Sequence, residues 1–225
     1  MPGPPFLLAL KGGRFITHNL KLRNAEPALA NFFASGVLAL GEKTGPFLWQ
    51  LPGTYAFSPE RLAGFLRLLP RTSAEAAVLA RGHNDRLPGE ALTKAATVVP
   101  YRHAFEVRHE SWFHPEMYAL LREHGAGFVV ADTAGRWRLA DEVTAGFVYV
   151  RLHGSRELYV SDYTDQELDE WARRISGWLG GQPPLDVYVY FDNDAKVHAP
   201  NDARRLRARV DARTASCAGP ARVRP

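Results

Sequence analysis

Two side chains that can do chemistry, Arg151 and His153, end the apolar segment Phe147–His153. Side chains alternate along a β-strand, so both share a face with Tyr149, and the valines and leucine occupy the other face. A guanidinium suits a phosphate or carboxylate, and an imidazole could act as a general base or a metal ligand. Gly154 follows at once and would let a ligand approach the backbone. The alternative is a histidine held by a neighbouring carboxylate for structural reasons.

A second charged pair, Glu106 and Arg108, ends the segment His103–Arg108. Glu106 could donate or accept a proton, and Arg108 could bind an anion. Two residues apart on one strand, the two side chains can also contact each other directly. A buried ion pair is therefore the structural alternative to a catalytic role.

Further polar groups end the other apolar segments. Asp132 is predicted as a third acid–base group beside Glu106 and His153, which makes those three the candidate catalytic residues. A divalent cation could be bound by three carboxylates and one imidazole, those of Asp132, Asp194, Glu106 and His153. No metal-binding motif supports this, so no metal site is assigned. The sequence does not indicate a cofactor. The candidate substrate-binding residues are Lys11, Gln50, Arg108, Arg151, Asp192 and Asp194.

The elements that must position these groups are short apolar runs separated by segments with helical spacing. A cap and a first-turn proline at Ser58-Pro59 predict one helix, and the capping box Thr164-Asp165-Gln166-Glu167 predicts another. Strands alternating with helices indicate a parallel sheet covered by helices. The six expected strands are Phe6–Lys11, Pro46–Leu51, His103–Arg108, Gly127–Thr133, Phe147–His153 and Asp186–Asp192.

Two architectures fit this alternation, an open doubly wound sheet and a closed (β/α)8 barrel. The glycine-rich dinucleotide motif is absent, since the nearest match, Gly125-Ala126-Gly127, precedes a strand. The apolar face of each strand should meet the helices, which leaves the polar face pointing inward. We therefore expect Lys11, Gln50, Asp132 and the charged pairs to converge on one end of a barrel, where such folds carry their sites.

The motifs that end these strands resemble the YecE-like family, a domain of unknown function (family 72) with a barrel fold. The resemblance runs from about Phe6 to Val210. The matching stretches are Lys11-Gly-Gly-Arg-Phe-Ile-Thr-His18, Leu48-Trp-Gln-Leu-Pro52, Phe105-Glu-Val-Arg-His-Glu-Ser-Trp112, Val130-Ala-Asp-Thr133, Phe147-Val-Tyr-Val-Arg-Leu-His-Gly154 and Val187-Tyr-Val-Tyr-Phe-Asp-Asn-Asp194.

The resemblance implies a TIM barrel truncated to six parallel strands with covering helices. Family members begin with a Gly-Trp strand and a second strand carrying Glu and Asn, and neither is present in the sequence. We therefore expect one incomplete barrel domain over residues 1–210, with the first two β/α units missing, and a basic, disordered tail over residues 211–225. The first and last strands would then be open sheet edges.

Charge and composition bound the remaining possibilities. Residues 201–225 hold seven arginines against two aspartates, whereas the whole chain has a net charge of +4, so the basicity belongs to the C-terminal segment. The single cysteine, Cys217, forms no internal disulfide, and no signal peptide or membrane-spanning run is present. These features predict a cytoplasmic protein without membrane contact.

The function expected from these residues is an enzyme acting by acid–base chemistry on a small anionic or polyhydroxylated substrate at the barrel mouth. Hydrolysis and isomerisation both stay open. The alternatives are a non-catalytic binder of nucleic acid or another acidic partner, which would use Arg108, Arg151 and the basic last helix, and an inactive truncated fragment. Nucleic acid is the less favoured partner, because the basic residues fit a solvated helix face.

Overall fold

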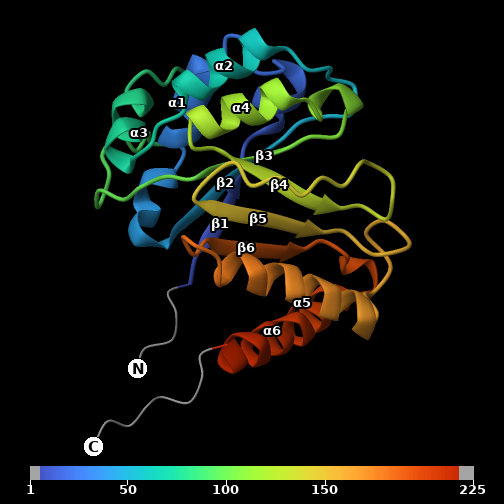
Figure 1. The fold of residues 1–225 in the computed structure, drawn as a ribbon. Helices are drawn as coiled ribbons and strands as arrows, with labels where there is room; N and C mark the ends of the chain where they lie inside the picture. Colours follow the sequence, from blue (N-terminus) through green and yellow to red (C-terminus); the bar gives the residue numbers. More distant parts are fainter. Residues whose placement is uncertain (1–5, 218–225) are drawn as a thin grey trace, which may run out of the picture. The chain divides into compact units, whose positions relative to one another are not determined.

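The computed structural model describes residues 6–217 and shows an α/β fold with six parallel strands (Figure 1). The chain divides into two compact units, residues 1–128 and residues 129–225. Hydrogen bonds join the strands in chain order from β1 to β6. All six predicted strands are confirmed, with ends that differ by no more than two residues.

The first unit contains three complete parallel strands and the start of a fourth. They are β1 (Leu8–Lys11), β2 (Thr44–Gln50), β3 (His103–Glu106) and the first residues of β4 (Gly127–Asp132). Strand β2 pairs with β1 on one side and with β3 on the other. It is buried from Gly45 to Gln50, as expected for an inner strand of a parallel sheet.

The helices of the first unit pack through apolar stripes. Leu62 and Phe65 are buried in α2, the helix predicted from Ser58-Pro59. Between residues 71 and 100, the chain contains α3 and then irregular structure up to β3. The elements are η1 (Phe15–Asn19), α1 (Glu26–Ala34), η2 (Val37–Lys43), α2 (Pro59–Leu68), α3 (Ser73–Ala80), η3 (Glu110–Trp112) and α4 (Pro115–Glu123).

A histidine in the core of the first unit has a structural role. His103 is buried between strand and helices, and its Nδ1 accepts a hydrogen bond from the Trp49 indole at 3.1 Å. Its Nε2 lies 2.8 Å from the carbonyl oxygen of Pro70, to which it donates. Burial lowers the pKa of His103 from 6.5 to about 4, so the ring is neutral at physiological pH.

The second unit contains the rest of β4, together with β5 (Phe147–Leu152) and β6 (Asp186–Phe191). Two long helices, α5 (Asp165–Leu179) and α6 (His198–Cys217), cover one face of these strands (Figure 1). A short helical turn, η4 (Asp194–Lys196), leads into α6. One apolar core lies between these strands and the two helices. Its buried residues are Val130, Val148, Val150, Leu152, Tyr163, Leu168, Trp171, Ala172, Ile175 and Leu206.

The C-terminal segment differs from its prediction. Residues 211–217, expected to be disordered, continue α6 as regular helix to Cys217. The Thr214 hydroxyl donates to the Val210 carbonyl at 3.0 Å, a bond to the preceding turn of the helix. The remainder of the predicted tail, residues 218–225, lies outside the described residues. Within residues 6–217, no helix is both long and apolar enough to cross a membrane.

The capping box before α5 yields the first testable prediction. The Thr164 side chain accepts from the Glu167 backbone N–H, and the Glu167 carboxylate accepts from the Thr164 N–H at 2.7 Å. Thr164→Ala should lower the free energy of unfolding by about 1 kcal/mol, because a backbone donor of the first turn loses its partner. Urea denaturation monitored by circular dichroism measures this loss.

Ser58 supplies a matched control, because it occupies the same position before α2 but makes no side-chain cap hydrogen bond. Ser58→Ala should therefore cost less than Thr164→Ala. An equal loss of stability in both variants would contradict the assignment of a functional cap to Thr164.

Candidate functional site

Three polar side chains end adjacent strands on one face of the first unit. Lys11 pairs in register with Leu48, and Gln50 pairs with Glu106. Since Leu48 and Gln50 are two residues apart, Lys11, Gln50 and Glu106 occupy the same face at the carboxyl ends of β1, β2 and β3. Lys11 is exposed, whereas Gln50 and Glu106 are buried. Within the unit, the three side chains therefore lie on one face of the sheet, as the alternation along each strand predicts.

Glu106 and Arg108 form the ion pair that the sequence allowed. Arg108 donates to the same carboxylate oxygen, Glu106 Oε1, from Nε at 3.2 Å and from Nη2 at 3.1 Å. The Glu106 side chain is 1% exposed and that of Arg108 is 15% exposed. A carboxylate this deeply buried requires a cationic partner to stay ionised, and Arg108 provides it.

In the second unit, the Asp192 carboxylate joins Arg151 and His153. Its Oδ2 atom accepts a hydrogen bond from Arg151 Nη2 at 2.8 Å and lies 3.0 Å from His153 Nδ1. The backbone brings the three groups together, because β5 and β6 are paired in register through Arg151–Tyr190 and Leu152–Phe191. The Asp192 N–H then donates to the Leu152 carbonyl at 2.8 Å and extends this ladder past the strand end.

The three groups differ in their access to solvent. The side chain of Asp192 is 38% exposed, whereas those of Arg151 and His153 are 10% and 0% exposed. Asp192 is therefore the member that an incoming molecule can contact. His153 lies behind it and packs edge-on against the Tyr159 ring, with 5.3 Å between the ring centroids.

Gly154 has a structural use that the sequence did not indicate. Its φ is +111°, and a Cβ atom at this position would lie 2.5 Å from the Glu157 carbonyl oxygen. Its N–H donates to the Tyr163 hydroxyl at 3.2 Å. The space that the missing side chain leaves is therefore occupied by the protein's own loop, which folds back over His153.

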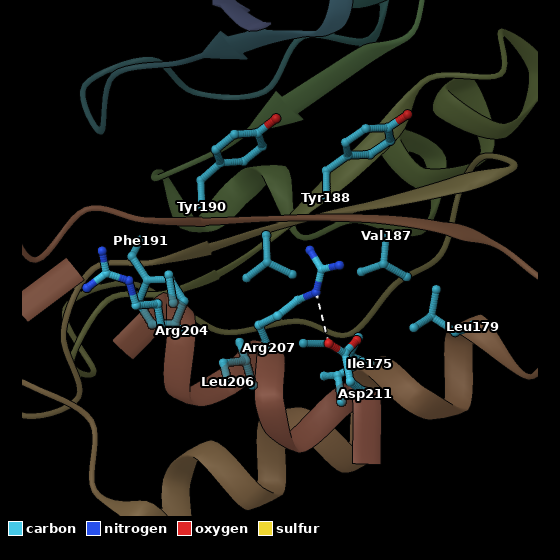
Figure 2. A pocket seen from close by; sticks show the side chains of 13 residues that line it. Ile175, Leu179, Val187, Tyr188, Tyr190, Phe191, Arg204, Leu206, Arg207 and Asp211 are labelled. Carbon is cyan, nitrogen blue, oxygen red and sulfur yellow. Dashed lines mark hydrogen bonds and ion pairs between the residues drawn. The ribbon is translucent and has the colours of Figure 1, made fainter. Parts of the chain in front are cut away.

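Tyrosines line the strand face that leads to Asp192. Tyr188 and Tyr190 project from the face of β6 opposite to Val187 and α6 (Figure 2). The Tyr149 and Tyr190 rings stack with centroids 4.9 Å apart. Arg151 is the register partner of Tyr190, so this tyrosine face and the Arg151–Asp192 pair are continuous.

Asp132 points to the other side of the strands, so its predicted inward orientation is wrong. It pairs in register with Leu152, which belongs to the helix-facing core. Its Oδ2 accepts a hydrogen bond from the Tyr163 hydroxyl at 3.2 Å, and its Oδ1 accepts from the Ala134 N–H at 3.3 Å. Burial raises the pKa of Asp132, and the two hydrogen bonds oppose this shift.

Asp194 is predicted to bind substrate, but its neighbour Asn193 is the buried residue of the two. Asp194 is exposed at the start of η4. Asn193 is fully buried, and its Nδ2 donates to the Ser161 carbonyl at 3.0 Å and to Asp202 Oδ2 at 2.9 Å. Sequence reasoning missed Asn193, because nothing in the local pattern shows that the chain turns sharply after β6.

A cavity of about 630 Å³ lies on the helix side of β6, between α5 and α6 (Figure 2). Its lining is mainly apolar, with Val187, Val189 and Leu206 among the residues that form it. Arg151, His153 and Asp192 do not line this cavity. Within the described part of the chain, no three histidine, cysteine, aspartate or glutamate side chains are grouped as metal ligands would be.

The basic face of α6 is largely neutralised within the second unit. Arg205 pairs with Asp165 at 2.7 Å and with Asp202 at 2.8 Å, and Arg209 pairs with Asp169 at 3.0 Å. These ion pairs fix α6 to α5. They also reduce the positive charge that the last helix would offer to a nucleic acid.

Comparisons with known proteins identify the family of the chain. The family described as "Protein of unknown function DUF72" matches residues 2–224. A DUF72 family protein of Thermotoga maritima has a similar fold, with a TM-score of 0.71, 24% sequence identity, and coverage of 93% of this chain and 75% of the other. A DUF72 family protein of Enterococcus faecalis gives a TM-score of 0.63 at 18% identity, over 92% and 74% of the two chains. No curated protein matches the sequence.

The raised pKa of Asp132 predicts a pH-dependent stability. A carboxyl group whose pKa is raised by folding stabilises the folded state at low pH, and this contribution is lost as the pH rises from 3.8 through the folded pKa. Asp132→Asn carries no charge at any pH. Relative to the wild type, the variant should therefore gain stability as the pH rises, which urea denaturation at several pH values measures. A relative loss with rising pH would mean that the ionised carboxylate is stabilised instead.

The loop over His153 yields a second prediction for this site. Gly154→Ala should lower the free energy of unfolding by about 1–3 kcal/mol, because its left-handed conformation disfavours a side chain and the Glu157 carbonyl blocks the Cβ atom. Gly146 is the matched control, since no atom lies within 4 Å of a Cβ added there. A cost for Gly146→Ala equal to that of Gly154→Ala would contradict the proposed constraint.

Proposed function

Because the chain belongs to the DUF72 family, whose function is unknown, we propose a function from its own side chains. It is an enzyme that transfers protons on a small anionic or polyhydroxylated substrate at the carboxyl ends of β5 and β6. The observation that carries this proposal is the single Asp192 carboxylate oxygen that meets both Arg151 and His153.

Asp192 is the proposed proton-transfer group, because it is the most exposed of the three. Arg151 donates a hydrogen bond to one of its oxygens and His153 lies 3.0 Å from the same oxygen, so the carboxylate needs little reorganisation when a substrate hydroxyl or a water molecule approaches. The buried His153 acts through Asp192 as a positioning residue. Hydrolysis and isomerisation are both within the proposal, since each requires a positioned acid or base.

The tyrosine face supports a polyhydroxylated substrate. Tyr188 and Tyr190 offer hydroxyl groups for hydrogen bonds and flat rings for the C–H face of a sugar. Arg151 supports an anionic group, because a planar guanidinium with five N–H donors matches the geometry of a carboxylate or a phosphate.

The proposal also covers the role of Glu106 and the complete architecture of the fold. Glu106, paired with Arg108, is proposed as an acid–base group of the first unit. The (β/α)8 barrel is proposed as the complete architecture, and the parallel strand order with helical connections supports it. Binding of nucleic acid by α6 finds less support, because Arg205 and Arg209 already pair with aspartates.

The test is turnover of defined compounds by the wild type and by Asp192→Asn. Aldose and ketose phosphates and aryl glycosides are incubated with the protein in D2O and followed by proton NMR, which detects both C–H exchange and hydrolysis. Asp192→Asn should lower kcat by about 10²–10⁴-fold, the usual contribution of a positioned acid or base. Arg151→Lys should also lower kcat, because lysine lacks the planar fork of donors.

Asp186→Asn is the matched control. Asp186 is exposed at the opposite end of β6, and its replacement changes the net charge equally. Its kcat should equal that of the wild type. Equal rates in the wild type and in Asp192→Asn, or no turnover across the compounds, would contradict the proposal.

A further inference from the structure

The first unit holds a group of cations that is separate from Asp192, the main proton-transfer group proposed above. Lys11 ends β1, Arg14 precedes η1, His18 lies within η1, and Arg108 follows β3. Lys11 and Arg14 are exposed, and His18 and Arg108 are half-buried. We call Lys11, Arg14, His18 and Arg108 the basic cluster.

The strand ladder places these residues at one end of the first unit. The Gly12 N–H donates to the Leu48 carbonyl at 2.9 Å, so the pairing of β1 with β2 continues past Lys11. A Cβ atom on Gly12 would lie 2.3 Å from the Trp49 ring, so the chain runs directly against β2 before it turns into η1. Beside them, the Leu51 N–H donates to the Glu106 carbonyl at 2.8 Å, just before Arg108.

The histidine of the basic cluster is held in a defined orientation. Thr17 is buried, and its hydroxyl donates to the Gly13 carbonyl at 3.3 Å. The same oxygen lies 2.8 Å from His18 Nδ1. This contact fixes the orientation of the imidazole ring, which carries an N–H at both Nδ1 and Nε2 when it is protonated.

Electrostatics show that the basic cluster acts on this ring as a group. Burial lowers the pKa of His18, and the positive charges of Arg14, Lys11 and Arg108 lower it further. These cations lie on β1, on the turn before η1 and on the chain after β3. Glu106 balances Arg108 through their ion pair, whereas Arg14 forms no ion pair within residues 6–217.

We propose that the basic cluster is a binding site for a phosphate dianion, either free phosphate or the phosphate group of a small monoester. Lys11, Arg14 and Arg108 provide the permanent positive charge, and protonated His18 adds an N–H donor at Nε2. A dianion with several acceptor oxygens binds more tightly to such a set of cations than a single carboxylate does. The inference goes beyond the proposed function, because the first unit alone carries it.

Anion binding and protonation of His18 must reinforce each other. A bound dianion cancels the repulsion between the imidazolium and the neighbouring cations, so it raises the pKa of His18. By linkage, the anion binds more tightly as the pH falls through that pKa. Sulfate is a suitable probe for this coupling, because it stays a dianion across the range in which histidine titrates.

The experiment measures binding of inorganic sulfate, inorganic phosphate and glycerol 3-phosphate to the full chain by calorimetry. NMR of histidine-labelled protein follows the His18 pKa with and without sulfate, and His18→Gln assigns the signal. The proposal expects saturable binding, a raised His18 pKa with sulfate, and a weaker pH dependence of sulfate affinity in His18→Gln. Tighter binding of glycerol 3-phosphate than of phosphate would identify a monoester as the natural ligand, and the reverse would identify free phosphate.

Arg14→Ala tests the site without disturbing the fold, because Arg14 is exposed. It should weaken phosphate affinity about tenfold, the usual effect of losing one charged hydrogen bond. Arg67→Ala, an exposed residue of α2 with the same charge, should leave affinity unchanged. No saturable binding, an unmoved His18 pKa, or equal losses in both arginine variants would overturn the proposal. Binding is measured without turnover, so neither proposal fails merely because the other does.

Discussion

The two-residue alternation of side chains along a parallel strand is the constraint on which the rest of this structure depends. In β5, Val148, Val150 and Leu152 enter the core beneath α5 and α6. Burial of that face is the main favourable term in folding, and it leaves no freedom in where the intervening residues point. Arg151 is directed to the opposite face for this reason, and it meets the carboxylate of Asp192 there.

Charged groups at the strand ends are tolerated because each is paired where water is scarce. A buried ionised group costs several kcal/mol unless a partner and hydrogen bonds compensate it. Glu106 is compensated by Arg108, and the partly exposed Asp192 by Arg151 and His153. The exposed edge of each cluster is the place where a substrate or an anion can replace water, which is why the proposed chemistry and the proposed phosphate site both lie at strand ends.

The same pairing of charges gives α6 a different role from the one that its arginine content suggests. Seven arginines in residues 201–225 favour an acidic partner when they are counted along the sequence. In the fold, Arg205 and Arg209 reach across to Asp165 and Asp169 and bind α6 to α5. Arg14, in the first unit, has no such partner within residues 6–217. Charge density in a sequence therefore identifies a binding surface only after intramolecular ion pairs are subtracted.

Much of the fold could be predicted from the sequence because its signals are local. Apolar runs bounded by polar residues located all six strands, and the capping box at Thr164 located the start of α5. Strand parity also oriented Glu106 and Arg151 correctly, since their neighbours on the opposite face are strongly apolar. The DUF72 resemblance was carried by the same strand-end motifs.

Only the tertiary structure decided which polar groups meet. Parity failed for Asp132, because Phe128, Val129, Val130 and Ala131 are apolar on both faces of β4 and give no preference. The meeting of Asp192 with His153 depends on the register between β5 and β6, and the burial of Asn193 depends on the turn after β6. Register and turns are set by contacts between residues far apart in the chain. A single sequence specifies what each strand carries, and the packed fold determines which neighbour each side chain contacts.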